Sequence, residues 1–509
     1  MRTHPSPTTA IVSAALTLLL ASAGSAQSAW LGATPPDGLA PPSQLAVLVG
    51  GRFQAPAATV PSGEEGDSEL DGARIYRDLV DIVGFSHASR ARGDLMWGRI
   101  SGFQSAVETA DWVAERFREA GLRDVAVQRY TADQGTSMWW PDHWEVRLLA
   151  DPALGTETRD IVLGSAVPTR GAEIPGRQLT APVVFAGDAG ALLDRDVTGK
   201  IAVQRVQPAS GAFGQRDAIG EGSAELYRRG AVAVLNYIDQ AGNMHVRDFG
   251  GCRICFNIGS ADGAFLRDLS ARAEREGKLD DLHIRLYLDA SSRTGLTAQN
   301  VMGVVPGVSD EIVIVNAHLD GWYDAAGDNG DGLAVLVALA RHYARPENRP
   351  ARTLVFVASG GHHSTGLNGP ANFVRANPEL TGRAVLVLNL EHIAQFLVNP
   401  ATFEVERAEQ SMGWGVTNMA PALLELTDRS KERYGFALRP QYSTSVAGDL
   451  GGYAPLGVPR VQAIHAGPLY HTSGDVLESI SVEGLERAAR FYAFWIEGVT
   501  RMPRAEINP

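Results

Sequence analysis

The sequence predicts an α/β fold, in which a mainly parallel mixed sheet carries helices on both faces and a β-rich domain is inserted. From residue 298 onward, apolar runs typical of buried strands alternate with helical patterns, which is the pattern of a parallel sheet connected by helices. Between residues 161 and 297, short β-like runs and turns dominate instead. The length of 509 residues also indicates more than one domain.

The elements follow in a regular order. Helical periodicity predicts helices near residues 71–84 and 103–120, the second of which ends at Gly121. After residue 298 we expect strands at 301–307, 311–320, 353–361, 384–392 and 459–467, and helices at 331–344, 370–378, 418–434 and 482–501. We therefore assign residues 71–160 and 298–509 to one α/β domain and residues 161–297 to the insert.

The N-terminal residues 1–26 are typical of a secretory signal peptide. Arg2 precedes an apolar run that is too short to span a bilayer, and cleavage is expected after Ala23 or Ala26. A membrane anchor is the less favoured alternative. Residues 27–70 are rich in Pro, Gly, Ala and Ser, which predicts an irregular lead-in. We expect a secreted or periplasmic mature protein without a stable membrane anchor.

Composition excludes some partners. The formal net charge is −13, with acidic residues spread along the chain, which argues against nucleic acid and anionic membranes as partners. No pattern predicts an oligomeric state. The two cysteines, Cys252 and Cys255, form a C-x-x-C motif. In the oxidising compartment expected for an exported protein, a local disulfide is favoured. Half a zinc site is less favoured because no second cysteine pair completes it, and a redox pair because the βαβ context of a redox motif is missing.

Polar side chains follow four of the expected strands, and one more lies in a loop. In chain order they are His318 and Asp320, Asp328 in the following loop, His362 and His363, Glu391, and His471. Parallel strands bring their carboxyl ends to one edge of a sheet. Imidazole and carboxylate are the ligands of zinc and similar ions, and a carboxylate such as Asp328 can bridge two metals. Asp320 is either a hydrogen-bond partner of a ligand imidazole or an ordinary turn residue.

These motifs resemble the co-catalytic zinc exopeptidases, the group that includes secreted aminopeptidases and glutamate carboxypeptidases. The resemblance covers about residues 71–160 and 298–509. It rests on NVMGVVPG (300–307), NAHLDGWYDAAGDNGDG (316–332), TLVFVASGG (353–361), VLNLEH (387–392), AGDLGGYAPLGVP (447–459) and LYHTSGD (469–475). The insert is similar to a protease-associated domain, through GKIAVQRV, RRGAVAVLNY and FNIGSADGAFL.

The resemblance implies two zinc sites, with a single ion as the alternative. One site uses His318, Asp328 and Glu391. The other shares Asp328 and uses His471 with one further ligand. In the family that ligand is the second Glu of a Glu-Glu pair, and the first Glu is the general base.

Here two histidines occupy the position of the Glu-Glu pair. His363 is then expected to be the ligand, as a neutral imidazole, and His362 the base. One extra residue before Gly366 leaves His363 and Ser364 as the alternative aligned pair. Tyr470 is similar to a tyrosine that stabilises the oxyanion, and a core aromatic is its alternative role.

Together with the predicted signal peptide, the resemblance implies a secreted, metal-dependent exopeptidase, aminopeptidase-like, that hydrolyses peptide or aminoacyl substrates. Its catalytic residues would be His362, Asp320 and Tyr470. The missing glutamate pair motivates an alternative hypothesis, a catalytically impaired relative that binds metal or peptides.

Overall fold

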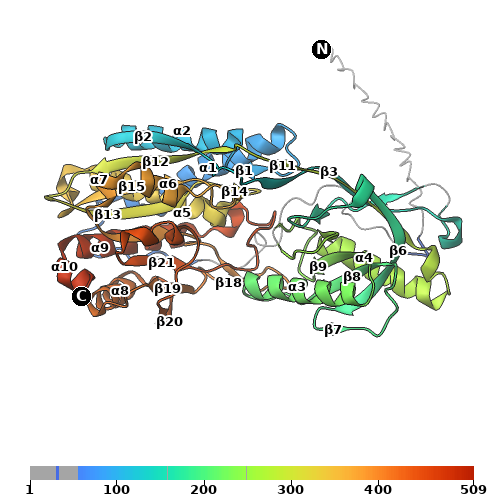
Figure 1. Cartoon of the computed structure of the whole chain (residues 1–509). Helices are drawn as coiled ribbons and strands as arrows, with labels where there is room; N and C mark the ends of the chain where they lie inside the picture. Colours follow the sequence, from blue (N-terminus) through green and yellow to red (C-terminus); the bar gives the residue numbers. More distant parts are fainter. Residues whose placement is uncertain (1–29, 34–54, 157–158, 248) are drawn as a thin grey trace, which may run out of the picture.

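The computed structural model describes residues 30–33, 55–156, 159–247 and 249–509. Figure 1 shows an α/β domain on the left and the insert, mostly green, on the right, with the long strands β3 and β11 running between them. The predicted signal peptide and most of the predicted lead-in lie outside the described residues. None of the described helices is both long and apolar enough to cross a bilayer.

The α/β domain is built on an eight-stranded sheet with the order β2-β12-β15-β13-β16-β21-β19-β20. Its strands are β2 (Arg123–Thr131), β12 (Thr297–Val305), β13 (Ser309–His318), β15 (Arg352–Ser359), β16 (Ala384–Leu390), β19 (Met412–Val416), β20 (Leu438–Ser443) and β21 (Arg460–Ile464). The four central strands, β15, β13, β16 and β21, run parallel. Antiparallel pairs flank them on both sides, so the predicted mainly parallel mixed sheet is confirmed.

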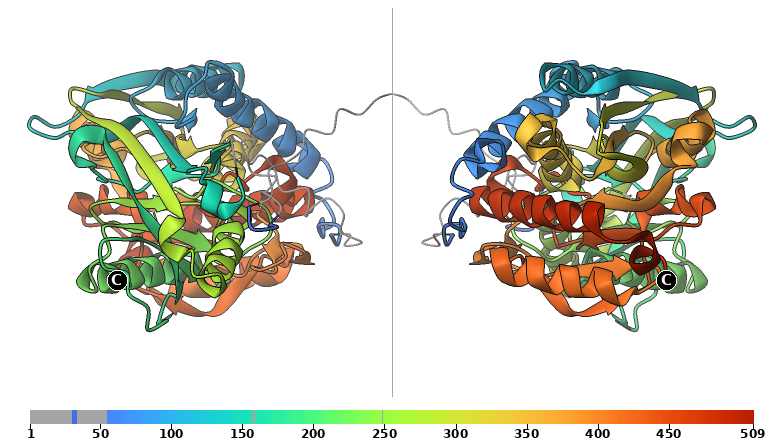
Figure 2. Two further views of the ribbon diagram at one scale, coloured as in Figure 1. Left: turned by 90° about the vertical axis from the view of Figure 1, so that its right-hand side faces the viewer. Right: turned by 90° about the vertical axis from the view of Figure 1, so that its left-hand side faces the viewer.

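Helices cover both faces of this sheet, as predicted. They are α1 (Gly72–Ala91), α2 (Gln104–Glu119), α5 (Asp331–Ala344), α6 (Gly369–Ala376), α7 (Pro378–Thr381), α8 (Pro421–Tyr434), α9 (Val482–Arg501) and α10 (Arg504–Ile507). Alternate residues of β13 point to opposite faces. Val313 and Val315 join the large core with the apolar side chains of α1, α2, α5, α8 and α9. Ile312 and Ile314 pack on the other face with Phe373 of α6. Figure 2 shows α9 (red) beside α8 (orange).

The insert has its own nine-stranded sheet and core. Its strands are β3 (Met138–Leu148), β4 (Ile161–Val162), β5 (Val167–Pro168), β6 (Gln178–Asp188), β7 (Ala191–Leu192), β8 (Ile201–Val206), β9 (Ala233–Ile238), β10 (Cys255–Asn257) and β11 (His283–Arg293), and its helices are α3 (Ala212–Arg228) and α4 (Ser260–Arg275). Because β3 pairs with β11 and β4, this sheet also includes Met138–Leu148, which the sequence analysis assigned to the α/β domain, and from here on the insert includes this strand. The favoured disulfide between Cys252 and Cys255 is present.

Four short strands lie outside these sheets, in two pairs: β1 (Gly98–Arg99) with β14 (Gly321–Trp322), and β17 (Leu397–Val398) with β18 (Val405–Arg407). The β1–β14 pair lies beside the loop that follows β13. Arg99 is fully buried there and donates hydrogen bonds to the carbonyls of Leu319, Asp324 and Ala325. One side chain thus holds the segment that leads from His318 to Asp328.

The insert is bonded to the segment that follows β21. Val246 forms an isolated β-bridge with Thr472, and the Arg247 N–H donates to the His471 carbonyl at 2.8 Å. Ser473 N–H in turn donates to the His245 carbonyl at 3.1 Å. The backbone of the predicted ligand His471 is therefore fixed by the insert as well as by its own domain.

Candidate active site

The structure brings all five predicted metal ligands together at the carboxyl ends of β13, β15, β16 and β21. Asp328 lies at the centre, between β14 and α5. Its Oδ1 is 3.3 Å from Nε2 of His318 and 3.4 Å from Nε2 of His363. Its Oδ2 is 3.2 Å from Nε2 of His471. Glu391 Oε1 lies 3.9 Å from His318 Nε2. The convergence expected from the topology is thus observed.

These separations fit donors arranged around metal ions. Zinc binds nitrogen and oxygen at about 2.0–2.2 Å in tetrahedral sites, so two donors on one ion lie about 3.3 Å apart. Two sets of donors lie close enough together to hold an ion: Asp328, His363 and His471 form one, and His318, His362 and His363 form the other.

Burial supports the same interpretation. Within the described ranges, His318 Nε2, His363 Nε2 and both carboxylate oxygens of Asp328 have no hydrogen bond, although Asp328 is only 3% exposed and His318 is fully buried. Buried polar atoms are almost always hydrogen-bonded, because leaving them unsatisfied is costly. Donors that converge without hydrogen bonds are therefore suited to a cation, and the residues present fit a divalent metal.

Neighbouring groups orient these donors. His318 Nδ1–H donates to the Asp320 carbonyl at 2.9 Å, which leaves Nε2 directed at Asp328. The Asp320 carboxylate accepts from the His363 N–H at 3.3 Å and lies 3.5 Å from His318 Nδ1. Asp320 thus contacts two predicted ligands, which favours a supporting role over that of a plain turn residue. Asp475, which had no predicted role, accepts hydrogen bonds from the backbone N–H groups of Gly327 and Asp328.

His362 is oriented by a carboxylate that the sequence analysis did not assign. Its Nδ1 lies 2.8 Å from Oδ1 of Asp449, and because a carboxylate only accepts, His362 is the donor. Asp449 Oδ2 accepts from the Ser359 hydroxyl and, at 3.0 Å, from Asn316. His362 Nε2 faces the site, 3.9 Å from Glu391 Oε1, and the ring stacks on His318 with centroids 4.0 Å apart. Asp449 belongs to the segment AGDLGGYAPLGVP, so its presence in a family motif was the available signal.

A fifth histidine, His392, also reaches the site without having been predicted. Its Nε2 is 3.2 Å from Asp328 Oδ1 and 3.7 Å from Glu391 Oε1. The available signal was its position directly after Glu391 at a strand end. The Asn329 side chain accepts from the His392 N–H at 3.3 Å and donates to the Leu390 carbonyl, which fixes this turn.

Tyr470 lies against the site through its ring. The ring stacks on His471, with centroids 3.7 Å apart, and lies 5.5 Å from the His392 ring. Phe213 and Phe249 of the insert contact its edges. A packing role is therefore observed, and the role at the oxyanion stays a prediction.

The clustered charges shift several pKa values. Burial raises the pKa of Asp328, but His363 and His392 outweigh burial and hold that pKa well below its usual range. Burial lowers the pKa of His363 to about 4. For His392, Asp328 and Glu391 outweigh burial and raise the pKa to about 9. Protonated imidazoles and a metal ion are alternative positive partners of these carboxylates. Without metal, the protons on the imidazoles balance the negative charge of the carboxylates.

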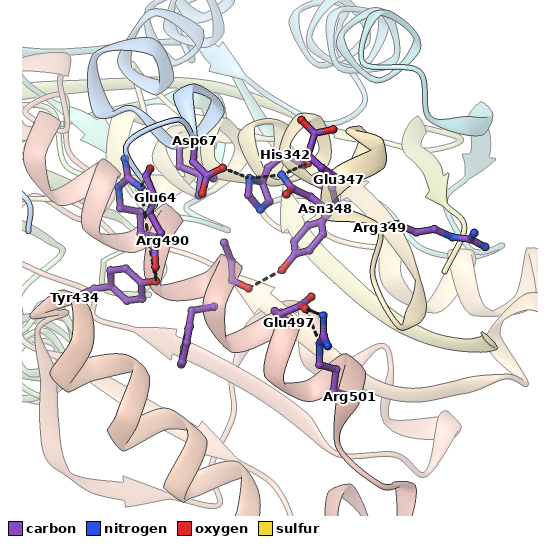
Figure 3. A pocket seen from close by; sticks show the side chains of 14 residues that line it. Glu64, Asp67, His342, Glu347, Asn348, Arg349, Tyr434, Arg490, Glu497 and Arg501 are labelled. Carbon is purple, nitrogen blue, oxygen red and sulfur yellow. Dashed lines mark hydrogen bonds and ion pairs between the residues drawn. The ribbon is translucent and has the colours of Figure 1, made fainter. Parts of the chain in front are cut away.

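A pocket of about 260 Å³ opens beside His362 and His363, and Arg170 of the insert contributes to its wall. A second pocket, of about 250 Å³, lies at the opposite end of α5 (Figure 3). Several of its charged groups are paired with one another, as in the contacts of Glu64 with Arg490 and of Glu497 with Arg501. It shares no residue with the site around Asp328, and from Asp331 to His342 the helix rises roughly 16 Å.

Comparison with known families finds a match over part of the chain. The profile of peptidase family M28 matches residues 300–496, which hold every predicted site residue. Among curated proteins, none matches the sequence.

Solved structures share the fold. The structure of a peptidase M28 precursor from Shewanella amazonensis SB2B has a TM-score of 0.64 at 19% identity, over 87% of this chain and 96% of that one. BSAP, a zinc aminopeptidase from Bacillus subtilis, has a TM-score of 0.56 at 21% identity, over 86% and 98%. An aminopeptidase from Aneurinibacillus sp. strain AM-1 has a TM-score of 0.52 at 18% identity, over 88% and 98%. The predicted resemblance to co-catalytic zinc exopeptidases is thus confirmed: the chain carries a peptidase family M28 domain over residues 300–496 and is a metallopeptidase.

Proposed function

We propose that this metallopeptidase is a secreted, zinc-dependent exopeptidase of the aminopeptidase type that works without a glutamate base. The observation that carries the proposal is the convergence of imidazoles on the buried Asp328, next to the pocket at His362 and His363. The description of the Bacillus subtilis neighbour as a zinc aminopeptidase supports the choice of metal and reaction. The disulfide between Cys252 and Cys255 supports an oxidising compartment.

The donors around Asp328 would hold two zinc ions, one near His318 and Glu391 and one near His363 and His471. When bound, two such ions polarise the scissile carbonyl and make water more acidic. The chain itself fixes the positions of the donors. It also keeps bulk water away from them, because Asp328, His318 and Glu391 are all buried. Donors fixed before substrate arrives need no rearrangement during the reaction.

His362 would handle the proton. Its Nδ1–H is engaged by Asp449, so the neutral ring presents Nε2 as an acceptor toward the site. The attacking water would give its proton to Nε2 as its oxygen bonds to the carbonyl carbon. His362 would then return that proton to the leaving nitrogen, which departs as an amine when the peptide bond breaks. Tyr470, stacked on His471, would face the oxygen of the same carbonyl.

The test is hydrolysis of a panel of aminoacyl and peptide substrates by the mature chain loaded with zinc or cobalt. We expect release of N-terminal residues. His362→Ala should lower kcat by about 10²–10⁴-fold, the usual contribution of a general base. His143→Ala, in an exposed histidine of the insert, is the matched control and should leave kcat unchanged. No hydrolysis of any substrate by the loaded wild type would contradict the proposal.

One observation favours a second candidate, a catalytically impaired relative that binds metal or peptides. Neither register at residues 362–364 supplies a glutamate base. On this hypothesis the wild-type chain is inactive, and the double variant His362→Glu/His363→Glu gains activity. Activity already present in the wild type would contradict it.

A further inference from the structure

The two halves of the site around Asp328 offer unequal numbers of protein donors. On one side, His363 and His471 accompany Asp328. On the other side, His318 and Glu391 accompany it, and His392 lies among them, 3.2 Å from Asp328 Oδ1 and 3.7 Å from Glu391 Oε1. His318 Nε2 has nearly the same two separations, 3.3 Å and 3.9 Å. His392 therefore occupies a position equivalent to that of His318 relative to both carboxylates.

The surroundings hold His392 in this position. The residue has a φ of +56°, in the left-handed region that non-glycine residues rarely adopt. Backbone of this kind persists where neighbouring contacts fix it, and it clusters at functional sites. Asn329, next to Asp328 in the chain, supplies those contacts to the His392 N–H and the Leu390 carbonyl. His392 is 4% exposed, and its Nε2 is directed at the carboxylates of Asp328 and Glu391.

We propose that His392 is a metal ligand, which gives the ion at His318, Asp328 and Glu391 a fourth protein donor. Zinc held by four protein donors is closed, as in structural sites, whereas zinc with three keeps a position for water or substrate. The inference rests on the proposed function. It gives the two ions different roles: the ion with four protein donors would be buried and firmly held, and the ion at His363 and His471 would keep an open position. Substrate would then approach the His363 side, where the pocket lies.

The first test follows metal binding and does not depend on activity. Metal-free full-length protein is titrated with zinc, and the one-equivalent complex is measured by zinc X-ray absorption, which counts imidazole ligands. We expect two imidazoles on the tighter ion of the wild type and one in His392→Asn, with zinc affinity at least about 10-fold lower in the variant, since even outer-shell changes cost 10–100-fold. Asparagine tolerates the left-handed backbone, so the variant should fold.

His143→Asn is the matched control and should match the wild type in both readouts. Equal imidazole counts and zinc affinities in the wild type and His392→Asn would overturn the role of His392. The count on the wild type needs no variant: a single imidazole on the first ion would overturn the inference even if His392→Asn failed to fold. A wild type that takes up no zinc would contradict the proposed function itself, together with this inference.

Discussion

Two buried carboxylates, one in each domain, show how this chain separates packing from function. Asp262 of the insert is fully buried, and neutral donors satisfy it: its oxygens accept from the Ser165 hydroxyl and from Asn243 at 3.1 Å. Asp328 is equally buried, yet within the described ranges its oxygens have no hydrogen bond and four imidazole nitrogens lie 3.2–3.4 Å away.

The pKa values of the two carboxylates are shifted in opposite directions, which agrees with the difference in their partners. Burial raises the pKa of Asp262 to about 6, because its neutral donors only partly offset the loss of water. The pKa of Asp328 lies well below the usual range, because His363 and His392 outweigh burial. The comparison teaches that burial alone does not indicate a site. A metal site is indicated when the partners of a buried carboxylate are groups that can themselves bind a cation, as imidazoles can.

The largest expected difference between the two carboxylates is the loss of activity and of bound zinc when each is replaced by asparagine. Asp328→Asn removes the charge that would hold two cations, and a metal supplies several kcal/mol to the transition state. We expect hydrolysis to fall by at least about 10³-fold and zinc stoichiometry to drop. Asp262→Asn should keep both. Kinetics and elemental analysis of the purified variants measure activity and zinc content. An active Asp328→Asn variant that binds zinc fully would contradict the difference between the two carboxylates.

Metal removal should destabilise only the α/β domain. A ligand at 100 times its Kd adds about 2.7 kcal/mol to the free energy of unfolding. Chelation should therefore lower the Tm of the wild type and of Asp262→Asn and leave that of Asp328→Asn unchanged. Calorimetry with and without chelator measures the effect. An equal Tm decrease in all three proteins would indicate that the metal binds elsewhere.

Replacing Asp449 should have a smaller effect than replacing Asp328, because Asp449 acts through His362. Asp449→Asn removes the charge and leaves one acceptor oxygen for the three donors His362, Ser359 and Asn316, so the His362 tautomer is held less firmly. We expect kcat to fall by up to about 10²-fold, with KM and zinc content unchanged. In a His362→Ala background the same change should have little further effect. Additive losses in that double variant would show that Asp449 supports the fold rather than His362.

Much of the fold and of the site could be predicted because both follow from local patterns. Apolar runs at 311–317 and 353–358 became β13 and β15, and the polar residues after them met at one sheet edge, since parallel strands leave no other arrangement. The periodicity of 331–344 likewise became α5. Residues that lie in a motif of the resembled family, such as His318 and Asp328, could be assigned to the site from the sequence alone.

The supporting groups could not be predicted, because their contacts are long-range. Asp449 meets His362 across 87 residues, and Asp475 meets Asp328 across 147. His392 follows an assigned ligand directly, but whether its ring turns toward that ligand depends on the left-handed backbone that Asn329 fixes. The pairing of β3 with β11 joins residues more than 130 positions apart, which no local pattern reveals.

The smallest expected effect is the pH dependence of stability that Asp262 contributes. With a folded pKa of about 6 against an ordinary value of 3.8, the folded state binds the proton more tightly than the unfolded state. The resulting stabilisation is full below about pH 4 and is lost as pH rises through about 6, by about 1–3 kcal/mol. Asp262→Asn should remove this slope, and the exposed Asp194→Asn is the matched control. Urea unfolding from pH 4 to 8 measures it. Parallel curves for wild type and Asp262→Asn would mean that the insert satisfies its buried carboxylate as fully as water does, and the contrast with Asp328 would then rest on geometry alone.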